Sequence, residues 1–367
     1  MKVLGIETSC DETAAAVVED GHKLLSNVVA SSMDLHAQYG GVVPEIAARS
    51  HIEVILSVID EALETAGCGW DDIDAIAVTY GAGLGGSLLI GVMTARTLAI
   101  AHNKPLYGAN HVEGHVYANF LTDTSLSQKG PAGRSVDTSE AFPIKLRDSQ
   151  PEFPMLAIIV SGGHSQLVLF RGHFDYELLG RTQDDAVGEA FDKVAKMLGL
   201  PYPGGPSVSK AALNGDPRKY SLPKAKMSKY DFSFSGLKTA VLRLAQAEIG
   251  ESYDFPSTKL PERLSEAQKR DIAASFQRVA IDTIVDKALL ACEEFEPKSV
   301  VIAGGVAANQ ELRRQLSAAL PLPIEYPNLT LCTDNGAMIA TLGCFKQMKR
   351  QPGSDPYTLA IEPNLSM

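Results

Sequence analysis

The order of expected strands and helices is written twice along this chain of 367 residues, and this repeat limits its fold more than any other feature. The first half opens with three β-rich runs and a helix. A strand then runs through GAGLGG into a second helix, and a short strand leads into a helix that begins with HVEGH. The strands are expected at residues 2–8, 13–19, 23–30, 74–79 and 105–108, and the first helix at 44–65.

The second half repeats this plan. Three β-rich runs precede a long helical stretch, a strand meets Gly304 and Gly305 before a helix, and a last strand leads into a helix near CTDNG. The strands are expected at residues 155–161, 165–171, 176–181, 299–303 and 323–326, and the long helix at 270–292. Both halves thus predict an α/β lobe with the same order of elements.

This organisation is that of the actin-like, sugar-kinase and heat-shock-protein ATPase superfamily, the ASKHA fold, in which two related lobes face each other across a nucleotide cleft. Its glycine turns let backbone N–H groups approach phosphate at a helix N-terminus, where the helix dipole favours anions. We expect an N-terminal lobe at 1–108, a C-terminal lobe at 109–330 and a last helix within 331–367 that packs back toward the cleft. The polar stretch at about 122–151 is expected to be a flexible insertion.

Composition narrows the functional class. The net charge is −11 and the pI about 5.3, which argues against a globally basic nucleic-acid binder but leaves room for a local basic patch. The five cysteines form no C-x-x-C pair, which favours a reducing, cytoplasmic location. No signal peptide is recognisable at the start, and glycines break the uncharged run at 75–95, so we expect no membrane span.

The sequence HVEGH predicts a metal site. A helix turns about 100° per residue, so His111 and His115 share one face while Glu113 points nearly opposite. That phase excludes the H-E-x-x-H metalloprotease arrangement, in which the glutamate acts on metal-bound water. The repeat matches this segment to EYPNLTLCTDNGA, which makes Asp334 the expected third ligand. Two histidines and one carboxylate suit catalytic zinc or iron(II), although these residues are also ordinary helix-capping and packing residues.

Nine segments of the chain resemble one protein family. They cover nearly all of the sequence outside about 122–151. The segments are GIETSCDETAAAVV (5–18), HAQYGGVVPEIAAR (36–49), NHVEGHVYA (110–118), IVSGGHSQL (159–167), DDAVGEAFDKVAKMLGL (184–200), YPGGP (202–206), FSFSGLKTAV (232–241), AGGVAANQELR (303–313) and CTDNGAMIA (332–340). The chain is identified on them as a member of the TsaD family of tRNA N6-adenosine threonylcarbamoyltransferases, formerly labelled glycoproteases, and is most similar to the bacterial type.

The resemblance implies transfer of a threonylcarbamoyl group from threonylcarbamoyl-AMP to the N6 amine of adenine at position 37 of tRNAs that read ANN codons. It implies one divalent metal per subunit, iron(II) favoured over zinc, and a site that also fits ATP or ADP. It further implies a paralogous ASKHA subunit of the TsaB type and a P-loop ATPase of the TsaE type as partners.

The resemblance also assigns residues. The positions that match the family's metal ligands are His111, His115 and Asp334, and those that match its substrate contacts are Ile159, Val160, Ser161, Gly162, Gly163, Asp192, Gly205 and Asn309. By spacing alone, Asp192 is more simply a surface acid paired with Lys193 or Lys196. Ser209 stands where some relatives carry an acid that contacts the ribose, which puts that contact in doubt.

Two carboxylates in the turn TSCDET are candidate catalytic residues. Asp11 and Glu12 are placed to accept the proton of the amine or to orient it, and they are equally suited to capping backbone groups in a hairpin turn. The stretch 216–238 carries six basic residues interleaved with aromatics, which suits tRNA but also a solvated loop. The alternative functions are a small-molecule kinase or ATPase on the same fold and a non-catalytic subunit, against which the metal triad argues.

Overall fold

The computed structural model describes residues 1–124, 126 and 146–367 and divides into two compact units. Unit 1 comprises Met1–Pro151 and Tyr326–Met367, and unit 2 comprises Glu152–Glu325. This division differs from the expected lobes, because residues 109–151 and the last helix both belong to unit 1. Most of the expected insertion at 122–151 lies outside the described residues.

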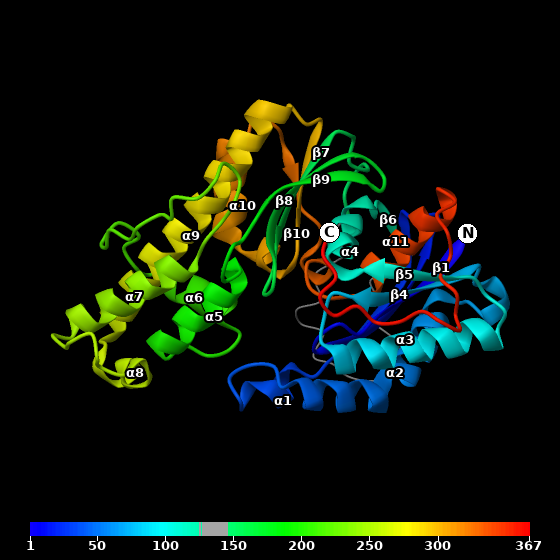
Figure 1. The fold of residues 1–367 in the computed structure, drawn as a ribbon, viewed down its shortest axis with the longest axis horizontal. Helices are drawn as coiled ribbons and strands as arrows, with labels where there is room; N and C mark the ends of the chain where they lie inside the picture. Colours follow the sequence, from blue (N-terminus) through cyan, green and yellow to red (C-terminus); the bar gives the residue numbers. More distant parts are fainter. Residues whose placement is uncertain (125, 127–145) are drawn as a thin grey trace. The chain divides into compact units, whose positions relative to one another are not determined.

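Each unit is built on one mixed sheet (Figure 1). The sheet of unit 1 has the order β5-β4-β1-β2-β3-β6 and that of unit 2 the order β11-β10-β7-β8-β9. The strands of unit 1 are β1 (Lys2–Glu7), β2 (Glu12–Glu19), β3 (Lys23–Ser31), β4 (Ala75–Gly81), β5 (Leu106–Asn110) and β6 (Asp123–Thr124). Those of unit 2 are β7 (Met155–Val160), β8 (Ser165–Gly172), β9 (Asp175–Arg181), β10 (Ser299–Ala303) and β11 (Ile324–Glu325).

The two sheets repeat each other strand by strand. In each, the first strand pairs antiparallel with the second and parallel with the fourth, and the fourth pairs parallel with the fifth. The strands β1 and β7 are buried along almost their whole length, as expected of strands covered on both faces. The predicted duplication of the fold is therefore confirmed.

The helices of unit 1 cover both faces of its sheet. Leu4 and Ile6 pack in one core with residues of α2 and α3, while Gly5, which points the other way, meets α11. The helices are α1 (Met33–Ala37), α2 (Pro44–Ala66), α3 (Gly85–Ala101), α4 (His111–Tyr117) and α11 (Gly336–Met348), with short 3-10 turns at Trp70–Asp72, Ala118–Phe120 and Leu329–Leu331.

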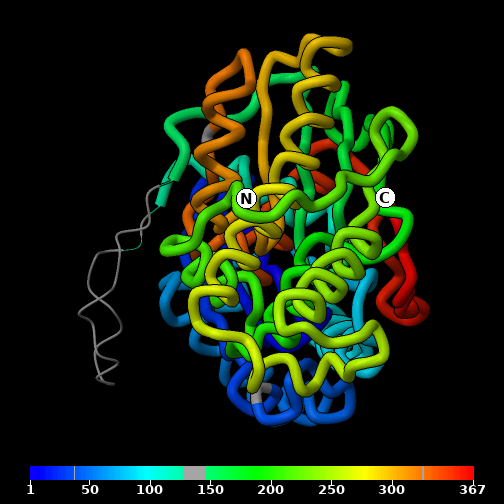
Figure 2. The backbone as a smooth tube through the Cα atoms, turned by 90° about the vertical axis from the view of Figure 1, so that its left-hand side faces the viewer, coloured from blue at the N-terminus to red at the C-terminus, as the bar shows by residue number. Residues whose placement is uncertain are grey.

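Helix α9 is the longest element of unit 2 and contacts α6, α7 and α10 (Figure 1, Figure 2). A capping box between Ser265 and Gln268 starts it, and the predicted apolar face is buried, with Phe276 fully so. The helices are α5 (Val187–Leu198), α6 (Gly204–Ala212), α7 (Ser235–Glu248), α8 (Leu260–Arg263), α9 (Glu266–Phe295) and α10 (Gln310–Ala319), with short 3-10 turns at Ser257–Lys259 and Gly305–Ala308.

The uncharged run at 75–95 forms β4, a glycine turn and the start of α3, as the sequence predicts. In the parts of the chain that the structure describes, no helix combines the length and the apolar character needed to cross a membrane.

Helix α11 lies directly on the β1–β2 hairpin because two glycines leave room for it. A Cβ atom on Gly5 would lie 2.3 Å from the backbone nitrogen of Ala340, and one on Gly336 would lie 2.5 Å from the carbonyl carbon of Ala15. Real Cβ atoms do not approach backbone this closely, so only glycine permits the contact. The contact fixes the start of α11, whose N-cap, Asn335, directly follows Asp334.

We predict that Gly5→Ala destabilises the protein by at least about 1–3 kcal/mol, because the new methyl group would overlap the α11 backbone at Gly336 and Ala340. Chemical denaturation of the purified variant measures this loss. The matched control is Gly85→Ala in the same unit, where a Cβ atom would meet its nearest neighbour at an ordinary 3.6 Å. Equal stability of the two variants would contradict the close packing of α11.

Candidate functional site

Three side chains expected as metal ligands come together within unit 1. His111 and His115 lie on α4, one turn apart and both buried. The N-cap residue Asn110 starts this helix, since its side-chain oxygen accepts from the backbone N–H groups of Val112 and Glu113 at 2.8 and 3.3 Å. The short helix is thereby fixed directly at the end of β5.

Asp334 reaches the same point from the start of α11. Asn335 caps that helix through a 3.0 Å hydrogen bond from the backbone N–H of Met338. Asp334 Oδ1 lies 3.2 Å from His115 Nε2 and 3.6 Å from His111 Nε2. The matching of HVEGH to CTDNG across the repeat thus correctly predicts this proximity.

The donor set fits a divalent metal. One ligand atom from each of the three residues lies within 4.8 Å of the others, and the two imidazole rings stand nearly perpendicular, at 78°. Burial lowers the pKa of His111, but the carboxylates of Asp334 and Glu7 outweigh burial and raise it to about 9. A site that holds a proton this tightly between carboxylates is one that a cation also stabilises.

Glu113 takes no part in this cluster. It is buried, and its Oε1 atom has no hydrogen-bond partner among the described residues. Burial raises the pKa of its carboxyl to about 7, opposed by the positive charge of Lys346. The sequence predicts that Glu113 points away from the two histidines, unlike the glutamate of a metalloprotease, and the structure agrees with this prediction.

Asp11 ends the turn between β1 and β2, and Glu12 is the first residue of β2. The charge of Glu12 interacts with those of Asp334 and Asp11. Burial, the charge of Asp334 and that of Asp11 together raise the pKa of Glu12 to about 9. The hydroxyl of Ser31 donates a weak hydrogen bond of 3.3 Å to Glu12 Oε1. Three carboxyl groups thus form one acidic cluster in unit 1, and a carboxyl with a raised pKa is a stronger base once it is ionised.

In metal-free protein, Glu12 should make stability depend on pH with a definite sign. The ordinary pKa of the side chain is 4.5, whereas the folded value is about 9. Between these values the folded chain holds a proton that the unfolded chain has released, so stability falls as pH rises from about 5 to 9.

Thermal unfolding of the metal-free protein across this range measures the effect. We expect Tm to fall toward pH 9 in wild type and to fall less in Glu12→Gln, whose side chain is neutral throughout. Parallel pH curves for the two proteins would contradict the raised pKa of Glu12.

In unit 2, the expected substrate residues 159–163 form the end of β7 and the turn that follows. Ile159 and Val160 are buried strand residues, whereas Gly162 and Gly163 are exposed with open space around them. Gly304, in a left-handed conformation with φ +88°, packs against this turn, where a Cβ atom would lie 2.6 Å from the Val160 carbonyl oxygen. The two glycine motifs of the second half are thus neighbours.

Asp192 fixes the next part of the site and is not simply a surface acid. Its Oδ1 atom accepts from the backbone N–H of Gly204 at 2.7 Å, at the start of α6. Burial raises its pKa, opposed by this hydrogen bond. Lys193 pairs instead with Asp185 and Glu189, each at 2.8 Å. Gly205, beside this contact, has open space where a side chain would lie.

Asn309 is the N-cap of α10, and its side chain already has partners. Its Oδ1 atom accepts from the backbone N–H of Leu312, and its Nδ2 atom donates to Ser209 Oγ at 3.0 Å and to Gln277 Oε1 at 3.1 Å. Ser209 also donates to the Gly205 carbonyl at 2.9 Å. Gln277 of α9 was not predicted from the sequence, where nothing distinguishes it from other polar residues of a long helix.

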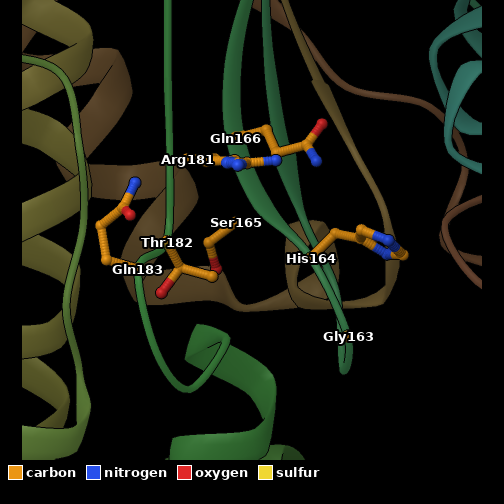
Figure 3. Close-up of a pocket in the computed structure, with 7 residues that line it drawn as sticks. All are labelled: Gly163, His164, Ser165, Gln166, Arg181, Thr182 and Gln183. Atoms are coloured by element: carbon orange, nitrogen blue, oxygen red, sulfur yellow. The ribbon is translucent and has the colours of Figure 1, made fainter. Parts of the chain in front are cut away.

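A pocket of about 300 Å³ opens beside the glycine turn, lined by residues 163–166 and 181–183. Figure 3 shows Gly163 at the tip of the turn, with Gln166 and Arg181 next to each other on the paired strands β8 and β9. The pocket offers one cationic side chain and several uncharged polar ones. The pocket adjoins the predicted substrate residues at Gly163.

The basic stretch 216–238 is largely occupied by internal contacts. Lys224 pairs with Asp286 at 2.6 Å and Lys238 with Asp185 at 2.8 Å, while Lys229 pairs with Glu294. Its aromatic residues are mostly internal as well: Tyr230, Phe232 and Phe234 are buried. The interpretation of this stretch as a continuous stacking surface for tRNA bases finds no support in these contacts.

Comparisons with known proteins decide the family. The family described as "TsaD: tRNA N6-adenosine threonylcarbamoyltransferase" matches residues 23–137 and 135–341 of this chain. Thus the chain belongs to the TsaD family. A tRNA N6-adenosine threonylcarbamoyltransferase of Thermomicrobium roseum is 50% identical over 348 residues, covering 93% of this chain and 90% of the relative. One of Dehalococcoides mccartyi is 47% identical over 369 residues, covering 100% and 99%.

A solved structure agrees with the fold. Full-length HypF, in its phosphate- and nucleotide-bound form, matches with a TM-score of 0.58 at 11% identity, covering 96% of this chain and 47% of HypF. The predicted duplicated α/β fold of the ASKHA type and the predicted TsaD family are both confirmed. Membership of the TsaD family favours a transferase over the alternative of a small-molecule kinase or ATPase.

Proposed function

We propose that this protein transfers the threonylcarbamoyl group of threonylcarbamoyl-AMP to the N6 amine of adenine 37 in tRNAs that read ANN codons. The observation that carries the proposal is the near full-length match to the TsaD family, together with the convergence of His111, His115 and Asp334. In the reaction the amine nitrogen bonds to the carbamoyl carbon, the bond from that carbon to the phosphate oxygen breaks, and AMP leaves.

The metal ligands in this proposal are His111, His115 and Asp334, holding one divalent ion, with iron(II) favoured and zinc the alternative. A bound divalent metal supplies Lewis-acid polarisation of a carbonyl oxygen and orientation of the substrate.

Asp11 and Glu12 are the proposed catalytic acids and bases. An adenine amine gives up a proton as its nitrogen acquires the new bond, and a carboxylate beside it accepts that proton. Burial, Asp334 and Asp11 raise the pKa of Glu12 in metal-free protein, so that its carboxyl holds a proton at neutral pH. A cation held by Asp334 would favour the ionised form of Glu12, and only that form can accept the proton of the amine.

The proposed donor site lies in unit 2. We assign the phosphate and acyl part of threonylcarbamoyl-AMP to Ile159, Val160, Ser161, Gly162 and Gly163, and its nucleoside part to Asp192, Gly205 and Asn309. Open space over Gly162, Gly163 and Gly205 supports contact through backbone groups. Because the Asp192 and Asn309 side chains already bond within the protein, their first role is to position these backbone groups.

The proposed partners are tRNA, a paralogous ASKHA subunit of the TsaB type and a P-loop ATPase of the TsaE type, and the proposed location is the cytoplasm, where tRNA is used. Exposed cations of the basic stretch, at Arg218, Lys219 and Lys226, have no ion pair within the described ranges and suit contact with tRNA phosphates.

A single-turnover assay tests the reaction. Metal-characterised protein is mixed with threonylcarbamoyl-AMP and unmodified tRNA, with and without the partner subunits, and the nucleosides are read by mass spectrometry. We expect modified adenosine from wild type and none from His111→Ala/His115→Ala, because the double variant has lost two of its three ligands. Product from Asp11→Ala/Glu12→Ala equal to that of wild type would remove those carboxylates from the mechanism.

The assay also separates the reaction from its alternative. Absence of modified adenosine with all partners present, combined with ATP turnover that does not require tRNA, would identify a kinase or ATPase instead. Retained metal content in Asp11→Ala/Glu12→Ala, measured in parallel, distinguishes loss of chemistry from loss of the metal site.

The paralogous subunit is proposed to dock on the outer surfaces of α2 and α3. These helices contact each other, and each exposes two apolar side chains four residues apart: Ile52 and Leu56 are 61% and 63% exposed, and Leu89 and Met93 are 47% and 46% exposed. Apolar groups exposed together on neighbouring helices favour a protein partner.

We therefore expect Ile52→Asp/Leu56→Asp to weaken binding of the paralogue at least about tenfold, since charges placed at the centre of an apolar interface must be desolvated. Light scattering of the mixed proteins measures the complex. The control Glu61→Lys changes an exposed residue of the same helix, and a complex as stable in the double variant as in this control would place the partner elsewhere.

A further inference from the structure

Glu7, at the end of β1, is a carboxylate with no exposure to solvent. It follows the fully buried apolar residues Leu4 and Ile6 of the same strand. Burying a charge costs several kcal/mol, by order of magnitude, unless the charge is hydrogen-bonded and paired. An apolar side chain of similar volume would fill this position at a lower cost. The carboxylate of Glu7 therefore needs an explanation other than packing.

The partners of Glu7 supply that reason. Its Oε1 atom accepts from the backbone N–H of Ser9 at 2.5 Å. Its Oε2 atom accepts from the hydroxyl of Thr79 at 2.5 Å and lies 3.2 Å from His111 Nδ1. A carboxylate can only accept, so His111 Nδ1 must carry the hydrogen in this contact.

This contact selects the tautomer of His111. With its hydrogen on Nδ1, the ring presents the lone pair of Nε2, which is the atom facing Asp334 at 3.6 Å. His115 has no such anchor, because its buried Nδ1 atom finds no hydrogen-bond partner in the described part of the chain. His111 is thus the ligand that the protein orients, and Glu7 is the group that orients it.

We propose that Glu7 is a positioning residue for the metal centre: it holds His111 with Nε2 toward the ion and raises the affinity of the site for a divalent metal. The inference rests on the proposed metal site and adds to it Glu7, which contacts the ring nitrogen of His111 that does not face Asp334. Carboxylates that accept from the second ring nitrogen of a metal-bound histidine commonly account for about 10–100-fold in metal affinity.

Replacement of Glu7 by glutamine should reverse the tautomer. The amide has one acceptor oxygen, which the Ser9 N–H requires, and its NH₂ group then faces His111 Nδ1 as a donor. The hydrogen of the imidazole is then displaced to Nε2, where it points at Asp334 and blocks metal coordination. Shape and volume are preserved, so the fold is expected to survive.

The test measures zinc affinity directly, by competition with a chromogenic chelator, on the full-length protein without tRNA. We expect Glu7→Gln to bind zinc about 10–100-fold more weakly than wild type. Two controls should bind like wild type. Ser9→Ala removes the other group near Nδ1, a hydroxyl at 3.1 Å, and Glu113→Gln neutralises a second buried carboxylate on α4 that does not touch the imidazoles.

Two further readouts separate positioning from a merely structural role. Nitrogen-15 NMR of the metal-free protein, recorded at a pH high enough to leave the His111 imidazole neutral, should show its single ring hydrogen on Nδ1 in wild type and on Nε2 in Glu7→Gln. Metal-free unfolding should show that the variant remains folded. Unchanged zinc affinity in Glu7→Gln, or a loss that appears in Ser9→Ala instead, would overturn the inference. A wild-type protein that binds no zinc or iron(II) would overturn the proposed metal site and this inference together.

Discussion

The packing of the last helix on the first hairpin is the contact on which the candidate metal centre depends. Asp334 is more than two hundred residues from the histidines in sequence, and it reaches them because α11 lies against β1 and β2 at the distance that Gly5 and Gly336 allow. A methyl group at either glycine would displace the start of α11. The position of one carboxylate is therefore set by the absence of two side chains where α11 meets the β1–β2 hairpin.

Much of this arrangement is readable from the sequence because it is duplicated. Strand order, glycine turns and the pairing of HVEGH with CTDNG all follow from reading one half against the other, and the structure agrees. The division of the chain into its two units cannot be predicted by comparing the two halves of the sequence. Residues 109–151 and 326–367 join unit 1 through helix packing, and local sequence patterns carry no information about which sheet a helix covers.

The residues that the sequence does not reveal are those that act through another residue. Glu7 looks like one acid in the motif GIETSC, and Gln277 like one polar residue in a 30-residue helix. Their roles depend on atoms brought close by the fold, His111 Nδ1 in one case and Asn309 Nδ2 in the other. Sequence spacing identifies groups that share a helix face, but it cannot identify a partner behind that face.

The two candidate sites use their charged and polar side chains in opposite ways. In unit 1, Asp11, Glu12 and Asp334 crowd together with raised proton affinity at Glu12, an arrangement that is costly until a cation or a proton is bound. In unit 2, Asp192 and Asn309 are already satisfied by internal hydrogen bonds. A site built this way loses little on binding an uncharged sugar or base, because its side chains need not be rearranged and its glycine turns present backbone groups that are already in place. The charged centre is thus suited to the reacting group, and the satisfied one to holding the nucleotide that leaves.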